Sequence, residues 1–304
     1  MDQSFFLILL AIIGGAIRVS TPFLFVSLGE CITEKSGRIN LGHEGSLITG
    51  AMVGYGISLW TGSPWIGILL AGLAGSLFGF FHGWICGKKG VNDIAMGIAM
   101  MMLGTGLAFF FGKSLIKPTA PRLPDFSLAF WSDSPQLIQA FKLNMLFVAG
   151  ILLALLLHYG FKYSRWGIKV RIAGESADAG KALGYNINRI RIFATAIGTF
   201  CSGVAGAYLS LYYPGSWNEG LSSGQGLMAV ALVIFAKWQP LQCLTASLLF
   251  GGAGAIGPAL QSIGISEGYY LYNAAPYILT LLLIIGNKSG KEIGNAPGEL
   301  SIVK

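Results

Sequence analysis

Long stretches of this chain carry no charge, and they constrain its fold more than any other feature. Residues 65–86 and 94–112 contain no Asp, Glu, Lys or Arg, and about 20 such residues are enough for a helix to cross a bilayer. A membrane β-barrel would alternate apolar and polar residues in segments of about ten, and no segment does so. Charged residues make up 11% of the chain, against roughly 25% in soluble domains. We therefore predict an all-α polytopic membrane protein.

The apolar spans set the number of crossings. The two short spans around Lys237 are either two short crossings or one re-entrant pair. We expect a bundle of about eight to ten transmembrane helices, some of them broken or re-entrant, in a single transmembrane domain over residues 1–304. The spans lie at 4–29, 46–60, 65–86, 94–112, 144–161, 192–212, 226–236, 240–256 and 274–286.

Two parts of the sequence resemble each other weakly. Residues 43–79 and 223–252 each run from a Gly-flanked polar turn, through an apolar segment and a Pro-containing break, into a second apolar segment. Shared composition alone is one explanation for this echo. The other is a fold of two weakly related halves, as in many transporters.

The loops indicate the topology. Residues 162–191 carry seven Lys and Arg against two acids, and short loops rich in Lys and Arg stay cytoplasmic. Lys88 and Lys89, two crossings earlier, fall on the same side. The loop at 113–143, with four prolines, then lies outside the cell, and we expect it to be irregular.

A polar segment interrupts the apolar pattern early in the chain. Residues 36–45 read SGRINLGHEG, with three glycines among the polar side chains. A plain cytoplasmic turn explains the charges, but gives no reason for the glycines. We favour a broken helix near a polar path, where freed backbone groups and polar side chains face a wet cavity. His43 and Glu44 are then either structural hydrogen-bond partners or path-lining groups.

Catalysis and metal binding have no support in the sequence. The GKS at 112–114 is not a P-loop, because Leu107 stands where the motif needs glycine, and GAGAIG at 252–257 lies inside a membrane span. The four cysteines contain no CxxC pair, so we expect no metal site and no disulfide. No catalytic residue and no cofactor is predicted, and any ATP hydrolysis belongs to a partner chain.

Two local patterns predict packing and contact. Gly75, Gly79 and Gly83 share one helical face, which is typical of close helix packing in membranes. In the basic loop, Ser176 can cap a short helix that Gly184 ends. Such a helix fits a groove of another protein, although an ordinary amphipathic loop helix is the alternative.

Three ordered blocks carry a resemblance to a known family. The segment TPFLFVSLGECITEKSGRINLGHEGSLITGA (21–51) resembles the GE-x-SGVxNxGxEG signature of permease subunits in the nucleoside and simple-sugar branch of ABC importers. That branch is related to the ribose and branched-chain amino acid permeases. WGIKVRIAGESADAGKALGYNINRIR (166–191) resembles its cytoplasmic coupling segment, and SSGQGLMAVALVIFAKWQPLQCLTASLLFG (222–251) resembles a third block.

The resemblance implies partners and site residues. It implies cytoplasmic ATP-binding subunits, a second permease chain in a homo- or heterodimer, and an extracytoplasmic solute-binding lipoprotein, with no nucleic acid. Residues 162–191 become a coupling loop, whose ATPase-coupling residues are Gly174, Glu175, Ser176, Ala177, Asp178, Leu183 and Gly184. The translocation-path candidates are Asn40, His43, Glu44, Asn92, Asp93 and Gln225.

One stretch departs from the family pattern. Members often carry an NQVVSG-like segment where this chain has VNDIAMG at 91–97. If this stretch lines the path, Asp93 changes the choice of solute. Alternatively, Asp93 is a first-turn acid at the start of a helix.

We therefore expect the permease subunit of an ABC importer in a bacterial cytoplasmic membrane. It would move a small polar solute, a nucleoside or a simple sugar, by alternating access driven by ATP hydrolysis on its partners. The alternative is a stand-alone secondary transporter or facilitator. Ionisable residues deep in the spans would support that alternative, and the spans contain few of them.

Overall fold

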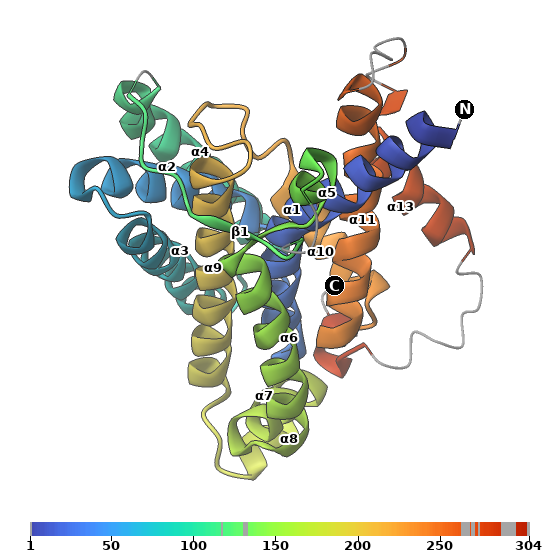
Figure 1. Cartoon of the computed structure of the whole chain (residues 1–304). Helices are drawn as coiled ribbons and strands as arrows, with labels where there is room; N and C mark the ends of the chain where they lie inside the picture. Colours follow the sequence, from blue (N-terminus) through green and yellow to red (C-terminus); the bar gives the residue numbers. More distant parts are fainter. Residues whose placement is uncertain are drawn as a thin grey trace.

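The computed structural model describes residues 2–116, 118–129, 133–262, 268, 271–272, 274–286 and 296–302. The described chain is almost entirely helical (Figure 1). The elements are α1 (Asp2–Lys35), α2 (His43–Thr61), α3 (Pro64–Cys86), α4 (Asp93–Gly112), η1 (Lys113–Leu115), β1 (Asp125–Ser127), α5 (Pro135–Ala140), β2 (Lys142–Asn144), α6 (Met145–Tyr163), α7 (Arg165–Glu175), α8 (Ala177–Ala182), α9 (Ile187–Leu211), α10 (Gln225–Phe235), α11 (Pro240–Ser262), α13 (Ala275–Gly286) and η3 (Gly298–Ile302).

The prediction of an all-α polytopic membrane protein is confirmed. Each of the nine predicted apolar spans corresponds to a helix: α1, α2, α3, α4, α6, α9, α10, α11 and α13. Six helical segments among the described residues are long and apolar enough to cross a membrane, namely Leu9–Lys35, Pro64–Cys86, Asp93–Leu115, Met145–Tyr163, Ile187–Leu211 and Pro240–Gln261. The other three spans correspond to α2, α10 and α13.

The two helices around Lys237 are unequal in length. Helix α10 has 11 residues and rises about 16 Å, so it cannot cross a hydrocarbon core of about 30 Å by itself. Helix α11 has 23 residues and is long enough. Lys237 and Trp238 join them with positive φ angles of 49° and 56°, which non-glycine residues seldom adopt. The pair is therefore a half-length helix that turns sharply into a full-length one.

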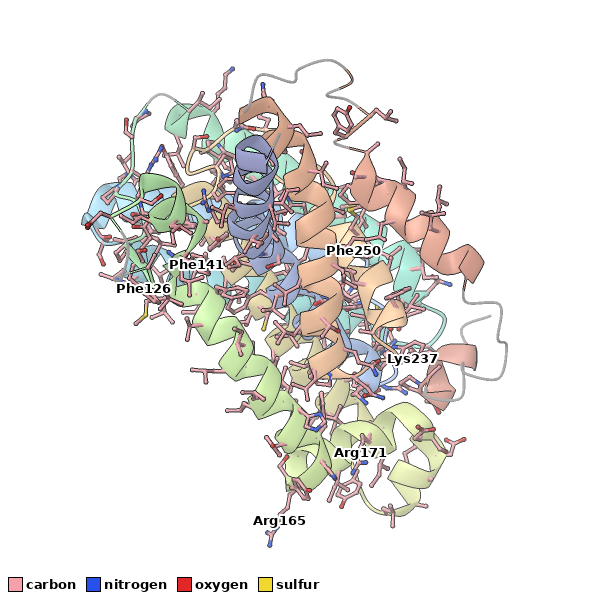
Figure 2. The ribbon with its side chains drawn as sticks, turned by 45° about the vertical axis from the view of Figure 1, so that its right-hand side comes forward. Phe126, Phe141, Arg165, Arg171, Lys237 and Phe250 are labelled. Carbon is pink, nitrogen blue, oxygen red and sulfur yellow. The ribbon has the colours of Figure 1, made fainter. Side chains whose placement is uncertain are left out.

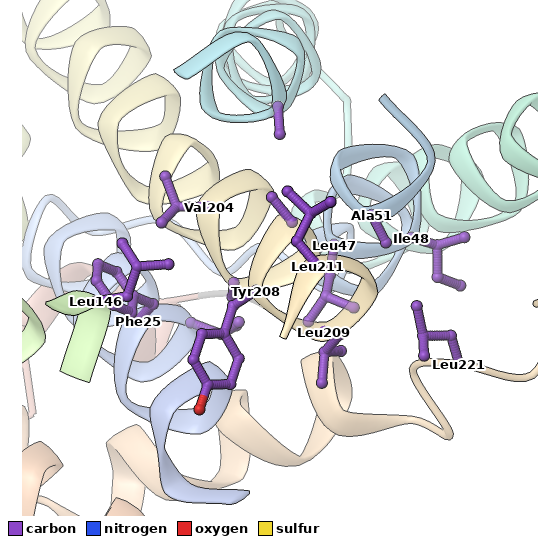
Figure 3. Packing of buried hydrophobic residues seen from close by; sticks show 14 of the residues in the cluster. Phe25, Leu47, Ile48, Ala51, Leu146, Val204, Tyr208, Leu209, Leu211 and Leu221 are labelled. Atoms are coloured by element: carbon purple, nitrogen blue, oxygen red, sulfur yellow. The ribbon is translucent and has the colours of Figure 1, made fainter. Parts of the chain in front are cut away.

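Helix α9 lies at the centre of the molecule. In Figure 1 it runs between a group formed by α2, α3 and α4 and a group formed by α1, α10 and α11. Its closest neighbours are α3, α2 and α1. Toward the end of α9 at Leu211, Val204 and Tyr208 are buried in one cluster with Leu47 of α2, Phe25 of α1 and Leu146 of α6 (Figure 3). Large apolar side chains are exposed on the outer faces of α3, α4 and α6, among them Leu77, Phe110 and Leu156, as expected for helices that face lipid.

Glycines allow α3 to approach α9 closely. A Cβ at Gly75 would lie 2.3 Å from the carbonyl oxygen of Thr199, and a Cβ at Gly79 would lie 2.0 Å from the Thr199 hydroxyl. At Gly83 it would lie 2.9 Å from Cα of Ile192. The predicted glycine face is therefore the face on which α3 and α9 meet, and any larger residue there would separate them.

Helix α1 contains an interior proline, and a residue of α9 donates a hydrogen bond to the carbonyl that this proline leaves without its helical partner. Pro22 has no N–H to donate to the carbonyl of Arg18, four residues earlier. The hydroxyl of Tyr208 donates to that carbonyl instead, at 3.1 Å. Because an unpaired carbonyl is costly inside a membrane protein, this bond stabilises the proline within α1.

The loop at 113–143 contains more regular structure than we expected. It holds η1, a short strand β1 and the short helix α5, and β1 pairs antiparallel with β2, with Asp125 opposite Asn144. Lys142 and Asp125 form an ion pair at 3.0 Å across the two strands. This small sheet lies at the opposite end of α6 from α7 and α8 (Figure 1).

Candidate site linking helix α8 to the helix break

The segment between α1 and α2 is an interior break rather than a surface turn. Helix α1 ends at Lys35, α2 begins at His43, and most residues between them are buried. Asn40 is 1% exposed and Arg38 is 8% exposed. Non-helical backbone at membrane depth is tolerated where it is enclosed by protein, and this segment meets that condition.

A histidine and a glutamate hold the break against the core. Glu30 accepts the backbone N–H of Asn40 at 2.9 Å, and its second oxygen is hydrogen-bonded to His43 Nε2 at 2.6 Å. The other ring nitrogen of His43 is hydrogen-bonded to the hydroxyl of Ser202 on α9. A neutral ring can donate from Nε2 and accept at Nδ1, so one tautomer satisfies both partners. Glu30, His43 and Ser202 are each fully buried.

A buried ion pair ties the break to α4. Arg38 forms a salt bridge with Asp93, and both side chains are about one-tenth exposed or less. Asn92 caps α4, because its side-chain oxygen accepts the backbone N–H groups of Ile94 and Ala95. The departure from the family pattern at Asp93 therefore supplies the partner of a buried arginine.

Glu44 joins the first turn of α2 to the first turn of α10. Its carboxylate accepts the hydroxyl of Ser222 at 2.5 Å and the backbone N–H groups of Gly224 at 3.2 Å and Gly226 at 2.6 Å. The first N–H groups of a helix have no partner within the helix and favour negative charge. A Cβ at Gly226 would lie 2.6 Å from Cα of Glu44, so only glycine allows this approach.

The far end of α10 is tied to α1. The indole N–H of Trp238 donates to the carboxylate of Glu34, which is 3% exposed. The sharp turn after α10 thus has a partner near the end of α1. Both ends of the half-length helix are held by glutamates from the first part of the chain, Glu44 and Glu34.

The predicted short helix in the basic loop is present. Ser176 is the N-cap of α8, and its hydroxyl oxygen accepts the backbone N–H of Ala179 at 3.2 Å. Asp178 lies in the first turn, and Gly184 follows the helix with a φ of 80°. Leu183 is 63% exposed. It borders a pocket of about 260 Å³ between α7 and α8, which Ile168 and Ile172 also line.

Helices α7 and α8 project from one end of the molecule. Figure 2 shows Arg165 and Arg171 at this end, far from Phe126 and Phe141 of the opposite loop. The turn that contains Lys88 lies at the same end, because Gly87, which precedes it, lies beside Asn188 at the start of α9. The basic residues of these two loops therefore lie at one end of the molecule, which fits the prediction that both loops are cytoplasmic.

Arg191 connects α7 and η3, the two elements beside α8, to the break between α1 and α2. Its guanidinium donates to the carbonyl of Ser36 at 3.0 Å and to the carbonyl of Ala173 at 2.9 Å. It also forms an ion pair at 3.0 Å with Glu299 of η3. The other carboxylate oxygen of Glu299 accepts the N–H of Ala177, the first residue of α8, at 2.7 Å. One arginine thus contacts the break, α7 and the segment that holds α8.

Gly174 brings α7 into direct contact with α1. A Cβ at this position would lie 2.2 Å from the carbonyl oxygen of Lys35. At the end of α7, η3 approaches Glu175 closely, because a Cβ at Gly298 would lie 2.7 Å from the carbonyl oxygen of Glu175. The segment predicted to couple to the ATPase is therefore packed against the end of α1 and against η3.

Gln225 lies between Gly224 and Gly226, the partners of Glu44, but its own surroundings differ from those of Glu44. It lines a pocket of about 390 Å³ bordered by α1, α9, α10, α11 and α13. Its side-chain oxygen is buried and has no hydrogen-bond partner within the described part of the chain. Asn40, His43, Glu44 and Asp93 instead have protein partners, which favours their structural role over a wet path.

Four residues of this site were not predicted to belong to it, namely Glu30, Ser202, Trp238 and Glu299. Glu30 is an ionisable residue at the end of an apolar span, and such a residue needs a partner. Trp238 belongs to the third block of the family resemblance, so both Glu30 and Trp238 could have been found. Ser202 and Glu299 could not have been found without the fold.

The chain is similar to known transport proteins along almost its whole length. A model of the family described as branched-chain amino acid transport system permease component matches residues 5–286. The guanosine ABC transporter permease protein NupQ of Bacillus subtilis is 28% identical over 295 residues, 92% of each chain. The nucleoside ABC transporter permease protein NupC of Lactococcus lactis subsp. cremoris is 26% identical over 289 residues, 90% of each chain.

A provisionally named glucose ABC transporter permease protein, TsgC13 of Haloferax volcanii, is 30% identical over 260 residues. The match covers 84% of this chain and 79% of that relative. No solved structure matches the chain.

Proposed function

The chain belongs to the family of branched-chain amino acid transport system permease components and is the permease subunit of an ABC importer, and we propose that its solute is a nucleoside or a simple sugar. Relatives named for guanosine, nucleosides and glucose support both solute classes. The subunit is a transport component with multiple membrane passes. The proposed location is the cytoplasmic (inner) membrane of a bacterium.

The family implies ATP-binding subunits and a solute-binding protein as partners. In the proposed complex, the ATP-binding subunits contact α7 and α8 on the cytoplasmic side. A second permease chain, either a copy of this one or a related one, completes the transmembrane part. A lipoprotein outside the membrane delivers the solute, and affinity for the solute resides largely in that lipoprotein.

The observation that carries the mechanism is the position of Arg191. In this proposal, closure of the ATP-binding subunits moves α8, which they grip through exposed Leu183 and the capped first turn at Ser176. Arg191 transmits the movement, because it is bonded to Ser36 in the break as well as to Ala173 in α7. The break carries the movement on to α2, α4 and α10 through its buried polar contacts.

Two sets of contacts determine which helices would move together in alternating access. Helix α3 is locked to α9 by glycine contacts, so these helices move together. Helix α10 is tied to α2 by Glu44 and to α1 by Glu34. The solute undergoes no chemical change, and all the free energy comes from ATP on the partner subunits.

The test is a surface variant that spares the fold. In the complete transporter, purified through this chain, Leu183→Asp is expected to lower solute uptake at least tenfold and to break its dependence on ATP hydrolysis. Leu183→Met keeps the apolar contact and serves as the matched control. Because Leu183 is mostly exposed, both variants are expected to insert and fold normally. Wild-type uptake by Leu183→Asp would contradict the assignment of α8 as the coupling helix.

A further inference from the structure

The pocket beside Gln225 lies on the side of the molecule away from α7 and α8. Its walls include Leu209 and Tyr213, at the end of α9 opposite to Arg191, and the first residues of α10. Its volume of about 390 Å³ lies in the range of small-molecule sites, roughly 300–1,000 Å³. A solute that enters from outside would reach this pocket before it reaches the break.

The lining of the pocket is mainly apolar and aromatic. Phe23, Tyr213 and Tyr277 contribute three aromatic rings, and Val19, Leu209 and Met228 add apolar side chains. Aromatic rings bind other flat rings by stacking, and base–aromatic stacking tolerates every base because each base has a π face. A simple sugar has hydroxyl groups around its edge, and an apolar wall would leave many of them without partners.

One polar atom of the pocket is a hydrogen-bond acceptor that has no partner in the described part of the chain. The side-chain oxygen of Gln225 is buried without a partner among the described residues. A free acceptor beside aromatic rings matches a flat ring that carries an N–H or amino donor at its edge.

We propose that this pocket is a transit site for the heteroaromatic base of a nucleoside, stacked among Phe23, Tyr213 and Tyr277, with Gln225 accepting a hydrogen bond from the N–H groups of the base. The inference rests on the proposed function, since it selects the nucleoside class over the sugar class for the same permease.

Photolabelling tests the site directly. Native membranes that contain the full-length chain are irradiated with 8-azidoadenosine, and the labelled peptides are identified by mass spectrometry. The label is expected on peptides that contain Tyr213 or Tyr277. Unlabelled guanosine or uridine is expected to reduce it at least fivefold, whereas ribose or glucose at the same concentration leaves it unchanged.

Variants connect the labelling to Gln225. Gln225→Leu is expected to reduce labelling at least threefold, and Gln242→Leu is the matched control, because Gln242 lies on α11 and does not line the pocket. Labelling outside the pocket, or equal competition by glucose, would overturn the inference. Labelling that Gln225→Leu and Gln242→Leu affect equally would overturn the role of Gln225.

Uptake measured in parallel separates this inference from the proposed function. ATP-dependent uptake of glucose without pocket labelling would overturn the inference and leave the permease assignment intact. Pocket labelling in membranes that take up neither guanosine nor glucose with ATP would support the pocket and count against the proposed function. ATP-dependent guanosine uptake that Gln225→Leu slows would support both.

Discussion

Glu44 accepts a hydrogen bond from the backbone N–H of Gly226 at 2.6 Å, and the first turns of α2 and α10 are joined by this contact. The two residues are 182 positions apart in the chain. A carboxylate from one helix thus satisfies the unpaired N–H groups at the start of another. The half-length helix α10 therefore depends on α2 for its position.

Removing this carboxylate should destabilise the protein. Glu44→Ala leaves the buried N–H groups of Gly224 and Gly226 without acceptors, at a cost of about 1–3 kcal/mol for each group. We expect a clear fall in the melting temperature in mild detergent and a loss of uptake. Glu44→Gln keeps one acceptor oxygen, so its melting temperature should lie between those of wild type and Glu44→Ala. A melting temperature for Glu44→Ala equal to wild type would show that α10 is positioned by other contacts.

Single and double variants of the buried ion pair between Arg38 and Asp93 should differ in stability in a way that is not additive. Arg38→Ala leaves a buried carboxylate unpaired, which costs about 3–5 kcal/mol. Replacing both partners, as in Arg38→Met with Asp93→Leu, should recover most of this loss, because apolar pairs of similar volume are often tolerated. Melting temperatures of the two single variants and the double variant test this coupling.

An exposed ion pair provides the control for that experiment. Lys181 and Asp178 pair at 2.9 Å with side chains 65% and 93% exposed, and such pairs contribute little. Lys181→Ala should therefore melt within a degree or two of wild type. A double variant at Arg38 and Asp93 that is as unstable as the sum of its single variants would contradict a direct pair.

The contact between α3 and α9 predicts the effect of added volume. In Gly79→Ala the new methyl group meets the Thr199 hydroxyl at 2.0 Å, so the variant should lose about 1–3 kcal/mol through overpacking. Gly106 of α4 is the matched control, since a Cβ there meets nothing within 4 Å. Gly106→Ala should be neutral or gain up to about 1 kcal/mol from helix propensity. Equal melting temperatures for the two variants would count against the close packing.

Glu299 should matter for coupling more than for folding. Glu299→Ala removes the acceptor of the Ala177 N–H and one partner of Arg191. We expect the complete transporter to hydrolyse ATP while moving less solute per ATP, because Glu299 no longer holds the start of α8 and Arg191 together. The measurement is the ratio of solute taken up to ATP hydrolysed.

Glu219, a glutamate at the end of the molecule opposite to α8, provides a control for the loss of a negative charge in Glu299→Ala. Glu219 is exposed in the loop between α9 and α10, so Glu219→Ala should keep the wild-type ratio. If Glu299→Ala also keeps it, η3 only packs against the coupling segment and takes no part in transmission.

Local features of the fold could be predicted from the sequence because their causes lie within a few residues. The cap at Ser176 and the end of α8 at Gly184 follow from hydrogen bonds and a φ angle inside one short stretch. The glycine face of α3 follows from helical periodicity. The span predicted at 226–236 differs from α10 by one residue at each end, because its borders are a glycine turn and Lys237.

The site could not be predicted as completely, because its bonds join distant segments. The sequence indicated a break at 36–45, but not that His43 would meet Ser202, 159 positions away. It marked Asp93 as unusual without giving Arg38 as its partner. It also suggested few charges inside the spans, whereas the fold brings Glu30, Glu34 and Asp93 to one buried region around the break.

The position of η3 has a consequence for how such transporters diverge. The residues matched by the family model end at 286, whereas the carboxylate that holds both Arg191 and the start of α8 belongs to residue 299. This carboxylate therefore lies outside the stretch that the family model matches. If Arg191 transmits the movement of α8 as proposed, changes confined to residues 296–302 can alter the amount of solute moved per ATP while every residue of the membrane helices stays the same.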